Sequence, residues 1–135
     1  MYVDISTSVY VKEHLHQFSH KTPIKPQHQP YPDPEWTYSV DAQKMKPLNT
    51  SPALPTEGVK IIEHIIETFL YYARGVDNMC LFPLGTMAKN NDPTEQYEKN
   101  VHQFLDNIAT NPNSMVIFHA SYIILCAETN SVYLT

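Results

Sequence analysis

The residues that could carry chemistry near the end of the chain are Glu128 and Asn130. They lie in the stretch YIILCAETNSVYLT, residues 122–135, directly after an apolar run. A strand that delivers a carboxylate at its tip often begins a metal-dependent nuclease site, because carboxylate oxygens hold the divalent ions. Asn130 is a neutral amide, which can contact a metal ion but adds no charge to hold it. Glu128 lies two residues earlier, about 6.6 Å away along a strand, too far for the same coordination geometry.

Four histidines form the densest group of potential metal ligands: His14, His16, His20 and His28. On a helix, His16 and His20 would share a face at the i, i+4 spacing that zinc sites use. A zinc site needs further ligands, and Glu13 is the one acidic residue at a fitting distance. We therefore predict ordinary histidines and no metal ligands, with a zinc site as the alternative.

Aromatic and basic side chains are interleaved at Tyr71, Tyr72 and Arg74. Nucleic-acid-binding surfaces use this combination, since rings stack on bases and a guanidinium reaches phosphates. Alternatively, Tyr72 flanks an apolar helix face, and Arg74 is a cation that the helix dipole favours at a C-terminus. We favour the structural interpretation and keep Tyr72 and Arg74 as the candidate nucleic-acid-binding residues.

The composition narrows the classes of function. The chain has 135 residues, enough for one domain with a core, and a formal net charge of -5 from 9 Lys and Arg against 14 Asp and Glu. Phosphate contacts need clustered cations, so this charge argues against a stand-alone nucleic-acid binder. No stretch approaches the roughly 20 apolar residues that span a bilayer, and the N-terminus lacks the features of a signal peptide. We expect an intracellular protein, cytoplasmic or nuclear, that is not secreted and has no membrane partner or small-molecule substrate.

The two cysteines, Cys80 and Cys126, both lie in apolar runs. Neither has a metal-type spacing to a histidine. We therefore expect buried, reduced thiols rather than a disulfide or a metal site.

Prolines divide the chain into segments. Most of them fall in residues 22–55, and because proline fixes φ and removes a backbone donor, we predict an extended connector there. Before the connector, Ser6 or Thr7 can cap a short helix. The apolar stripe of this helix consists of Val9, Val11, Leu15 and Phe18.

Two long helices follow the connector. The first is predicted over residues 57–74, with Thr56 as N-cap and Gly75 as the stop. Its apolar stripe consists of Ile62, Ile65, Ile66, Phe69, Leu70 and Ala73. The second follows DPTE, residues 92–95, in which Asp92 would cap the helix and Glu95 would complete a capping box. Its buried side chains would be Tyr97, Val101, Phe104, Leu105 and Ile108.

Between and after these helices the pattern is less regular. Pro83 lies inside the apolar run MCLFPLGTMA, so it either kinks a helix or belongs to its first turn, with Asp77 or Asn78 starting a separate turn. The runs SMVIFH, residues 114–119, and YIILCA, residues 122–127, predict a β-hairpin around a two-residue turn. The fold class is therefore α+β, with segments at 1–21, 22–55, 56–113 and 114–135. No further strand is expected to complete a sheet.

Three motifs, taken in order, resemble one protein family. They are TFLYYARGVDNMCLFPLGTMA at 68–88, PTEQYEKNVHQFLDNIATNP at 93–112 and IFHASYIILCAETNSVYL at 117–134. Together they are similar to the segment that joins polymerase to ribonuclease H in the Pol polyprotein of LTR retrotransposons of the copia type. The front of the chain, with VDIS and YVKEHLHQFSHKTPIKPQH, resembles the reverse transcriptase thumb-side helix and connector that follow the polymerase palm. This resemblance implies a short strand and helix in residues 1–21.

The resemblance implies lost catalysis. Ribonuclease H cleaves the RNA of an RNA:DNA hybrid with two divalent ions, Mg²⁺ in the parent family, and its first metal-binding carboxylate aligns with Asn130. The remaining carboxylates would lie beyond Thr135. MYVDIS resembles a polymerase Tyr-x-Asp-Asp turn, but Ile5 replaces the second aspartate. The chain departs from the family pattern at Glu67, Pro83, Tyr122 and Asn130.

We therefore expect a degenerate fragment of this transposable element, a pseudoenzyme that has no cofactor. One alternative is residual binding of an RNA:DNA hybrid as partner, weakly and without cleavage. The other alternative is a protein-interaction module adopted by the host, in which the connector and the exposed hairpin edge bind a protein partner.

Overall fold

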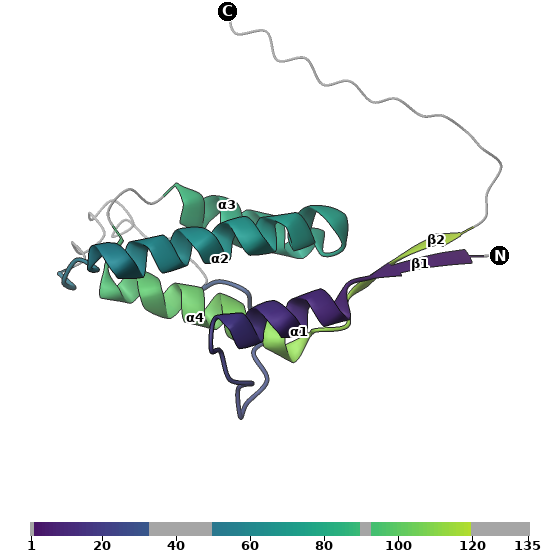
Figure 1. Ribbon diagram of the computed structural model, residues 1–135, viewed down its shortest axis with the longest axis horizontal. Helices are drawn as coiled ribbons and strands as arrows, with labels where there is room; N and C mark the ends of the chain where they lie inside the picture. Colours follow the sequence, from purple (N-terminus) through teal and green to yellow (C-terminus); the bar gives the residue numbers. More distant parts are fainter. Residues whose placement is uncertain (1, 33–49, 90–92, 120–135) are drawn as a thin grey trace, which may run out of the picture.

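A computed structural model describes residues 2–32, 50–89 and 93–119 of the chain. Its elements in order are β1 (Tyr2–Ser6), α1 (Ser8–Gln17), α2 (Thr56–Gly75), the short 3-10 helix η2 (Asn78–Cys80), α3 (Leu81–Ala88), α4 (Glu95–Thr110) and β2 (Met115–His119). Figure 1 shows a body of helices from which the two strands extend as a ribbon. This arrangement confirms the predicted α+β class.

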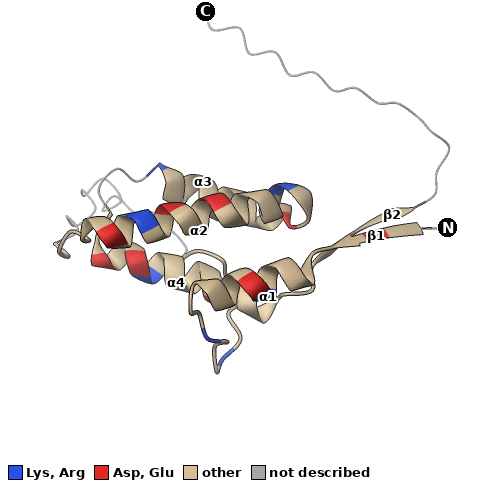
Figure 2. Ribbon diagram, viewed as in Figure 1, with Lys and Arg blue, Asp and Glu red and all other residues tan. Residues whose placement is uncertain are grey.

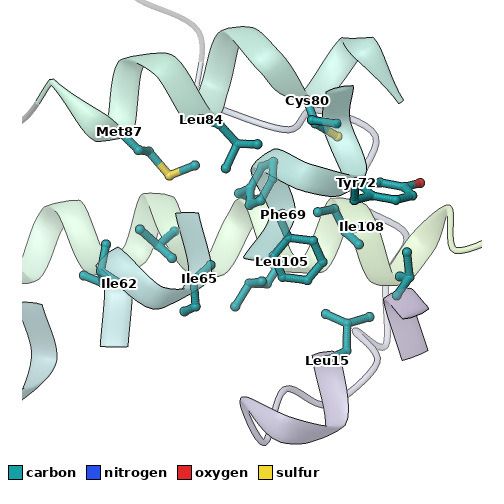
Figure 3. Close-up of a cluster of buried hydrophobic side chains, with 14 of the residues drawn as sticks. Leu15, Ile62, Ile65, Phe69, Tyr72, Cys80, Leu84, Met87, Leu105 and Ile108 are labelled. Atoms are coloured by element: carbon teal, nitrogen blue, oxygen red, sulfur yellow. The ribbon is translucent and has the colours of Figure 1, made fainter. Parts of the chain in front are cut away.

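The core forms where the apolar stripes of α2 and α4 meet. All five side chains predicted to be buried in α4 are buried, as are four of the six predicted in α2, while Ile66 and Leu70 are partly buried. The rings of Phe69 and Phe104 meet edge to face, with centroids 6.0 Å apart. Figure 3 shows Leu84 and Met87 of α3 closing one side of this cluster. Burial of these stripes is the main favourable term for the fold.

The short N-terminal helix belongs to the same core. Val11 and Leu15 of α1 are buried in the cluster that α2 and α4 form, and Phe18 packs against it. Val9, which we assigned to the same stripe, is 66% exposed. Val9 and Val11 are two positions apart, which corresponds to a rotation of about 200° around the helix axis, so the two side chains lie on different faces.

The predicted boundaries of the long helices need correction. α2 begins at Thr56 itself, after Pro55 as N-cap. α4 begins at Glu95 after Thr94, so the capping box from Asp92 is wrong. The reason is a bridge to the end of the connector: Leu54 N donates to Pro93 O at 3.0 Å, and Glu95 N donates to Pro52 O at 3.1 Å. This pairing holds the residues before Glu95 in an extended conformation.

The broken helix around Pro83 is confirmed. Asp77 accepts a hydrogen bond from Met79 N and starts η2. Pro83 is the third residue of α3 and is buried. In the first turn of a helix the N–H that proline lacks has no intrahelical acceptor, so Pro83 costs α3 no hydrogen bond.

The part of the connector before residue 33 has neither helix nor strand, as predicted. Polar side chains of α4 bind its backbone. Asn107 Nδ2 donates to Gln27 O at 2.9 Å, Gln27 N donates to Thr110 Oγ1 at 3.0 Å, and Gln103 Nε2 donates to Gln29 O at 3.2 Å. We call residues 20–29 the strap. It covers one face of α4 along about two turns.

The strand pairing differs from the predicted hairpin. β2 is a strand, but its partner in the described part of the chain is β1, antiparallel, with Tyr2 opposite His119 and Ser6 opposite Met115. The expected partner, residues 122–127, lies outside the described residues. The expectation that no further strand would complete a sheet was wrong: a short strand was expected within residues 1–21, but five residues are too few for their alternation to indicate a partner.

Alternation separates the two faces of the β1–β2 ribbon. One face carries only apolar side chains: Val3, Ile5, Val116 and Phe118. Of these, Val3, Ile5 and Phe118 are exposed. We call this the apolar ribbon face. Among the helices that the structure describes, none has the length and apolar character needed to cross a membrane.

Two phenylalanines test how the core is distributed. Phe104 is fully buried, whereas Phe82 is 75% exposed on α3. Phe104→Ala should lower the free energy of unfolding by about 3–5 kcal/mol, because it leaves a cavity between α2 and α4. Phe82→Ala, the matched control, should change it by less than about 1 kcal/mol. Urea unfolding followed by circular dichroism measures both, and equal losses would contradict the placement of the core.

Candidate functional site

The structure separates the two residues that the sequence marked as nucleic-acid candidates. Arg74 is exposed on the last turn of α2, but Tyr72 is only 2% exposed and belongs to the core. The ring of Tyr72 therefore cannot stack on a base, and this part of the prediction is corrected. Tyr71 is 70% exposed instead. Consecutive helical residues point about 100° apart, so only one of the two tyrosines can face the core.

A cavity of about 450 Å³ lies beside these residues, where the last two turns of α2 face the junction of β1 and α1. We call it the junction cavity. Its lining residues are Ile5, Thr7, Glu67, Leu70, Tyr71, Tyr72, Arg74, Gly75 and Val76. Figure 1 shows that this junction is also where the ribbon leaves the helical body. The volume is in the range of small-molecule sites.

Two residues that line this cavity, Thr7 and Tyr72, have hydroxyl oxygens that are buried from solvent and make no hydrogen bond of good geometry. Thr7 is the N-cap of α1, as one of the two predicted alternatives, but its side chain makes no capping hydrogen bond. Its φ of -133° and ψ of 42° are not the extended values usual at an N-cap. A buried hydroxyl without a partner costs about 1–3 kcal/mol, so both groups destabilise this end of the fold.

The surroundings of Tyr72 shift the pKa of its hydroxyl. Burial raises the pKa of Tyr72, and the nearby Ser114 hydroxyl lowers it by a smaller amount. Ser114 Oγ makes its own hydrogen bond to Asp77 Oδ2 at 3.1 Å. Figure 3 shows the Tyr72 hydroxyl at the outer edge of the core cluster, pointing away from Phe69. The phenol is therefore neutral at physiological pH.

The charges around the cavity are sparse. Arg74 and Glu67 are the cation and the carboxylate of its lining. No carboxylate of the residues that the structure describes forms an ion pair with Arg74. Figure 2 shows acidic and basic residues mixed along α2 and α4, with few charges on the ribbon. The cavity thus has an unpaired cation but no basic cluster.

A second cavity, of about 460 Å³, lies between α2, the end of α3 and the start of α4. Glu63, Glu67 and Tyr97 are among its lining residues. Its buried phenol is satisfied, because Tyr97 Oη donates to Met87 O. The Tyr97 hydroxyl therefore gives no indication of a ligand in this cavity.

The histidines do not form the zinc arrangement that we considered. α1 ends at Gln17, and Ser19 has a φ of 54°, so His20 leaves the helical face that carries His16. His20 Nε2 instead lies 2.7 Å from Asp106 Oδ1 and fixes the strap to α4. Within the described ranges, no three His, Cys, Asp or Glu side chains are grouped as metal ligands would be.

The remaining chemical candidates divide between core and undescribed chain. Cys80 is a buried free thiol, and burial raises its pKa to about 12, so it is not a nucleophile at neutral pH. Asn130 and Glu128, the residues of the nuclease-like pattern, lie outside the described residues, as does Cys126. Sequence reasoning considered Thr7 only as a helix cap, since nothing in the order of residues shows that it lines the same cavity as Tyr72.

The chain matches no protein-family model, no curated protein and no solved structure. The site must therefore be interpreted from its own geometry.

Paired tyrosine variants test whether the Tyr72 hydroxyl is unsatisfied. Tyr97→Phe removes a bonded hydroxyl and should lower the free energy of unfolding by about 1–2 kcal/mol. Tyr72→Phe removes an unbonded one and should leave stability unchanged within about 0.5 kcal/mol, or raise it. Both changes keep the ring and its packing. Thermal and urea unfolding of the two variants gives the comparison, and an equal loss from Tyr72→Phe would show that its hydroxyl is bonded.

Proposed function

We propose that the chain is a non-catalytic connection segment, a degenerate piece of a retrotransposon Pol polyprotein in which the polymerase thumb runs into the start of ribonuclease H. Its role would be mechanical: it holds the two flanking parts in a fixed relation. The order of the three resembling motifs supports the proposal, as does the neutral amide at Asn130, where the family has a metal-binding carboxylate.

The observation that carries this proposal is the pairing of β1 with β2. β1 lies in the segment that resembles the end of the polymerase, and β2 in the segment that resembles the start of the nuclease. All five residues of β1 face residues of β2. Backbone pairing of this kind would transmit position between the two parts, because a sheet register is discrete and cannot slide continuously.

The helical body between the strands would set the distance and angle of this coupling. α1 follows β1 after one residue, and its buried Val11 and Leu15 anchor it to α2 and α4. α4 is joined to β2 by four residues, among them Ser114, which bonds Asp77 near the end of α2. Both strands are therefore fixed at their base by the same core.

An activity assay tests the non-catalytic part of the proposal. A labelled RNA:DNA hybrid incubated with the chain and Mg²⁺ or Mn²⁺ should remain intact, because a single carboxylate at Glu128 cannot hold two divalent ions. Wild-type protein and a Glu128→Gln variant should behave alike. Hydrolysis by the wild type that disappears in Glu128→Gln would overturn the proposal.

The same hybrid, in a gel-shift experiment at low salt, separates simple coupling from residual binding. At a net charge of -5, no shift is expected with high micromolar protein. A shift that Arg74→Gln weakens, and that the charge-matched control Lys60→Gln leaves unchanged, would favour the residual-binding alternative.

A host-adopted interaction module is the second candidate, and the apolar ribbon face favours it. A contiguous apolar surface of this kind marks interaction sites more often than chance exposure does. A module under selection should unfold in one cooperative step in urea, with coincident circular dichroism and fluorescence transitions. A broad transition with binding of 8-anilinonaphthalene sulfonate would instead indicate a decayed fragment without fixed packing.

A further inference from the structure

We propose that Thr22 is a phosphorylation site, modified by a proline-directed Ser/Thr kinase that recognises a basic side chain three residues after the acceptor. The motif is TPIK, residues 22–25. The site is independent of the connection role proposed above.

The residues of this motif lie between two attachments of the strap. His20 Nε2 lies 2.7 Å from Asp106 Oδ1 on one side, and Gln27 N donates to Thr110 Oγ1 at 3.0 Å on the other. Residues 21–26, between these attachments, make no hydrogen bond to other described residues. Figure 1 shows the chain leaving the helical body after α1 as a loop and then returning to it. A kinase can therefore bind this backbone without breaking a hydrogen bond of the described fold.

The acceptor and its neighbours are accessible. Thr22 and Lys25 are exposed, and Ile24 is completely so. Pro23 disfavours the helical conformation at Thr22, so the acceptor residue stays in the extended region that a kinase cleft binds. Proline also brings into the cleft no N–H that would need an acceptor there. The order Thr-Pro therefore suits a proline-directed kinase.

Lys25 supplies the charge that such a kinase recognises. It lies three residues after Thr22, and residues 14–32 contain no Asp or Glu, although the whole chain has a net charge of -5. Figure 2 shows basic residues and no acidic ones on this loop. Lys25 forms no ion pair with any residue that the structure describes. An acidic pocket of the kinase can therefore pair with Lys25 without competition from a carboxylate of the same stretch.

The sequence contains a second Ser/Thr-Pro pair, at Ser51, which the structure makes a poor acceptor. Ser51 is partly buried and has an interaction of its own. The carbonyl of Pro52 accepts from Glu95 N at 3.1 Å, so a kinase would have to break this bridge before the backbone could enter its cleft. The third residue after Ser51 is Leu54, not a cation. Thr22 is therefore the preferred acceptor of the two.

The reaction is a phosphoryl transfer from ATP. The Oγ1 of Thr22 attacks the γ-phosphorus, and the bond between that phosphorus and the oxygen bridging to the β-phosphate breaks. ADP leaves, and the hydroxyl proton passes to the catalytic base of the kinase. The product carries an added charge of about -1.5 to -2. This charge lies two residues from His20, so the phosphate oxygens can compete with Asp106 for the imidazole that holds the strap on α4.

Incubation of the full chain with a cyclin-dependent kinase and MgATP, followed by mass spectrometry, tests the site. Such a kinase recognises both the proline and the following cation. One phosphate on Thr22 is expected and none on Ser51, so Thr22→Ala should abolish incorporation, whereas Ser51→Ala should leave its rate unchanged. A phosphate at Ser51 in place of Thr22 would overturn the proposal. So would the absence of incorporation while a control peptide is phosphorylated in the same reaction.

Lysine variants test how the kinase recognises the site. Lys25→Ala should lower kcat/KM about tenfold, because it removes a charge-assisted contact. Lys21→Ala, the matched control, removes the other cation of the loop and should lower kcat/KM by less than about twofold. Equal losses from the two variants would show that the kinase responds to net charge and would overturn the role of Lys25.

The ring signals of His20 in the isotope-labelled chain report whether the phosphate reaches the attachment of the strap. Phosphorylation should shift these signals, whereas those of His119 at the end of β2 should stay unchanged. Equal behaviour of the two histidines would contradict the competition for His20. The mass-spectrometric result decides the modification site separately.

Discussion

The contact between the apolar stripes of α2 and α4 is the interaction on which the other elements depend. Phe69 and Phe104 meet at its centre, and each remaining helix adds to this pair rather than forming a core of its own. α1 contributes two buried side chains, and α3 contributes Leu84 and Met87. Helices as short as α1 and α3 are marginal in water by themselves. Their persistence here therefore rests on the surface that the two long helices provide.

Periodicity predicted this central pair well, because sixteen or more residues sample the helical repeat several times. Features fixed by distant partners were not predictable. The start of α4 depends on a bridge to residues 52–54, and β2 pairs with a strand more than a hundred residues away in sequence. Local signals such as DPTE and the two-residue turn pointed to near neighbours in both cases. A capping pattern states a preference worth about 1 kcal/mol, which tertiary hydrogen bonds can outweigh.

The candidate site shows the same limit at the level of single residues. Arg74 and the two tyrosines were noticed because they lie close together in the sequence. Neighbouring residues of a helix point in different directions, however, so Tyr72 is buried and Tyr71 is exposed. Thr7 and Tyr72 line the same cavity only because folding brings the start of α1 beside the end of α2. A threonine before a helix is expected to cap it. Here its hydroxyl is turned away from that role, and no local pattern signals this.

The strap on α4 has a consequence for how the two segments tolerate substitution. α4 binds the backbone of the strap. On the strap, the bonded groups are the main-chain N–H and carbonyl of Gln27 and the carbonyl of Gln29. On α4, they are the side chains of Gln103, Asn107 and Thr110. Most side chains of the strap can therefore change without loss of attachment, provided the backbone stays extended, as its prolines favour. The polar face of α4 has no such freedom. The strap therefore tolerates many different side chains, whereas the polar face of α4 requires particular ones, although the two segments form a single interface.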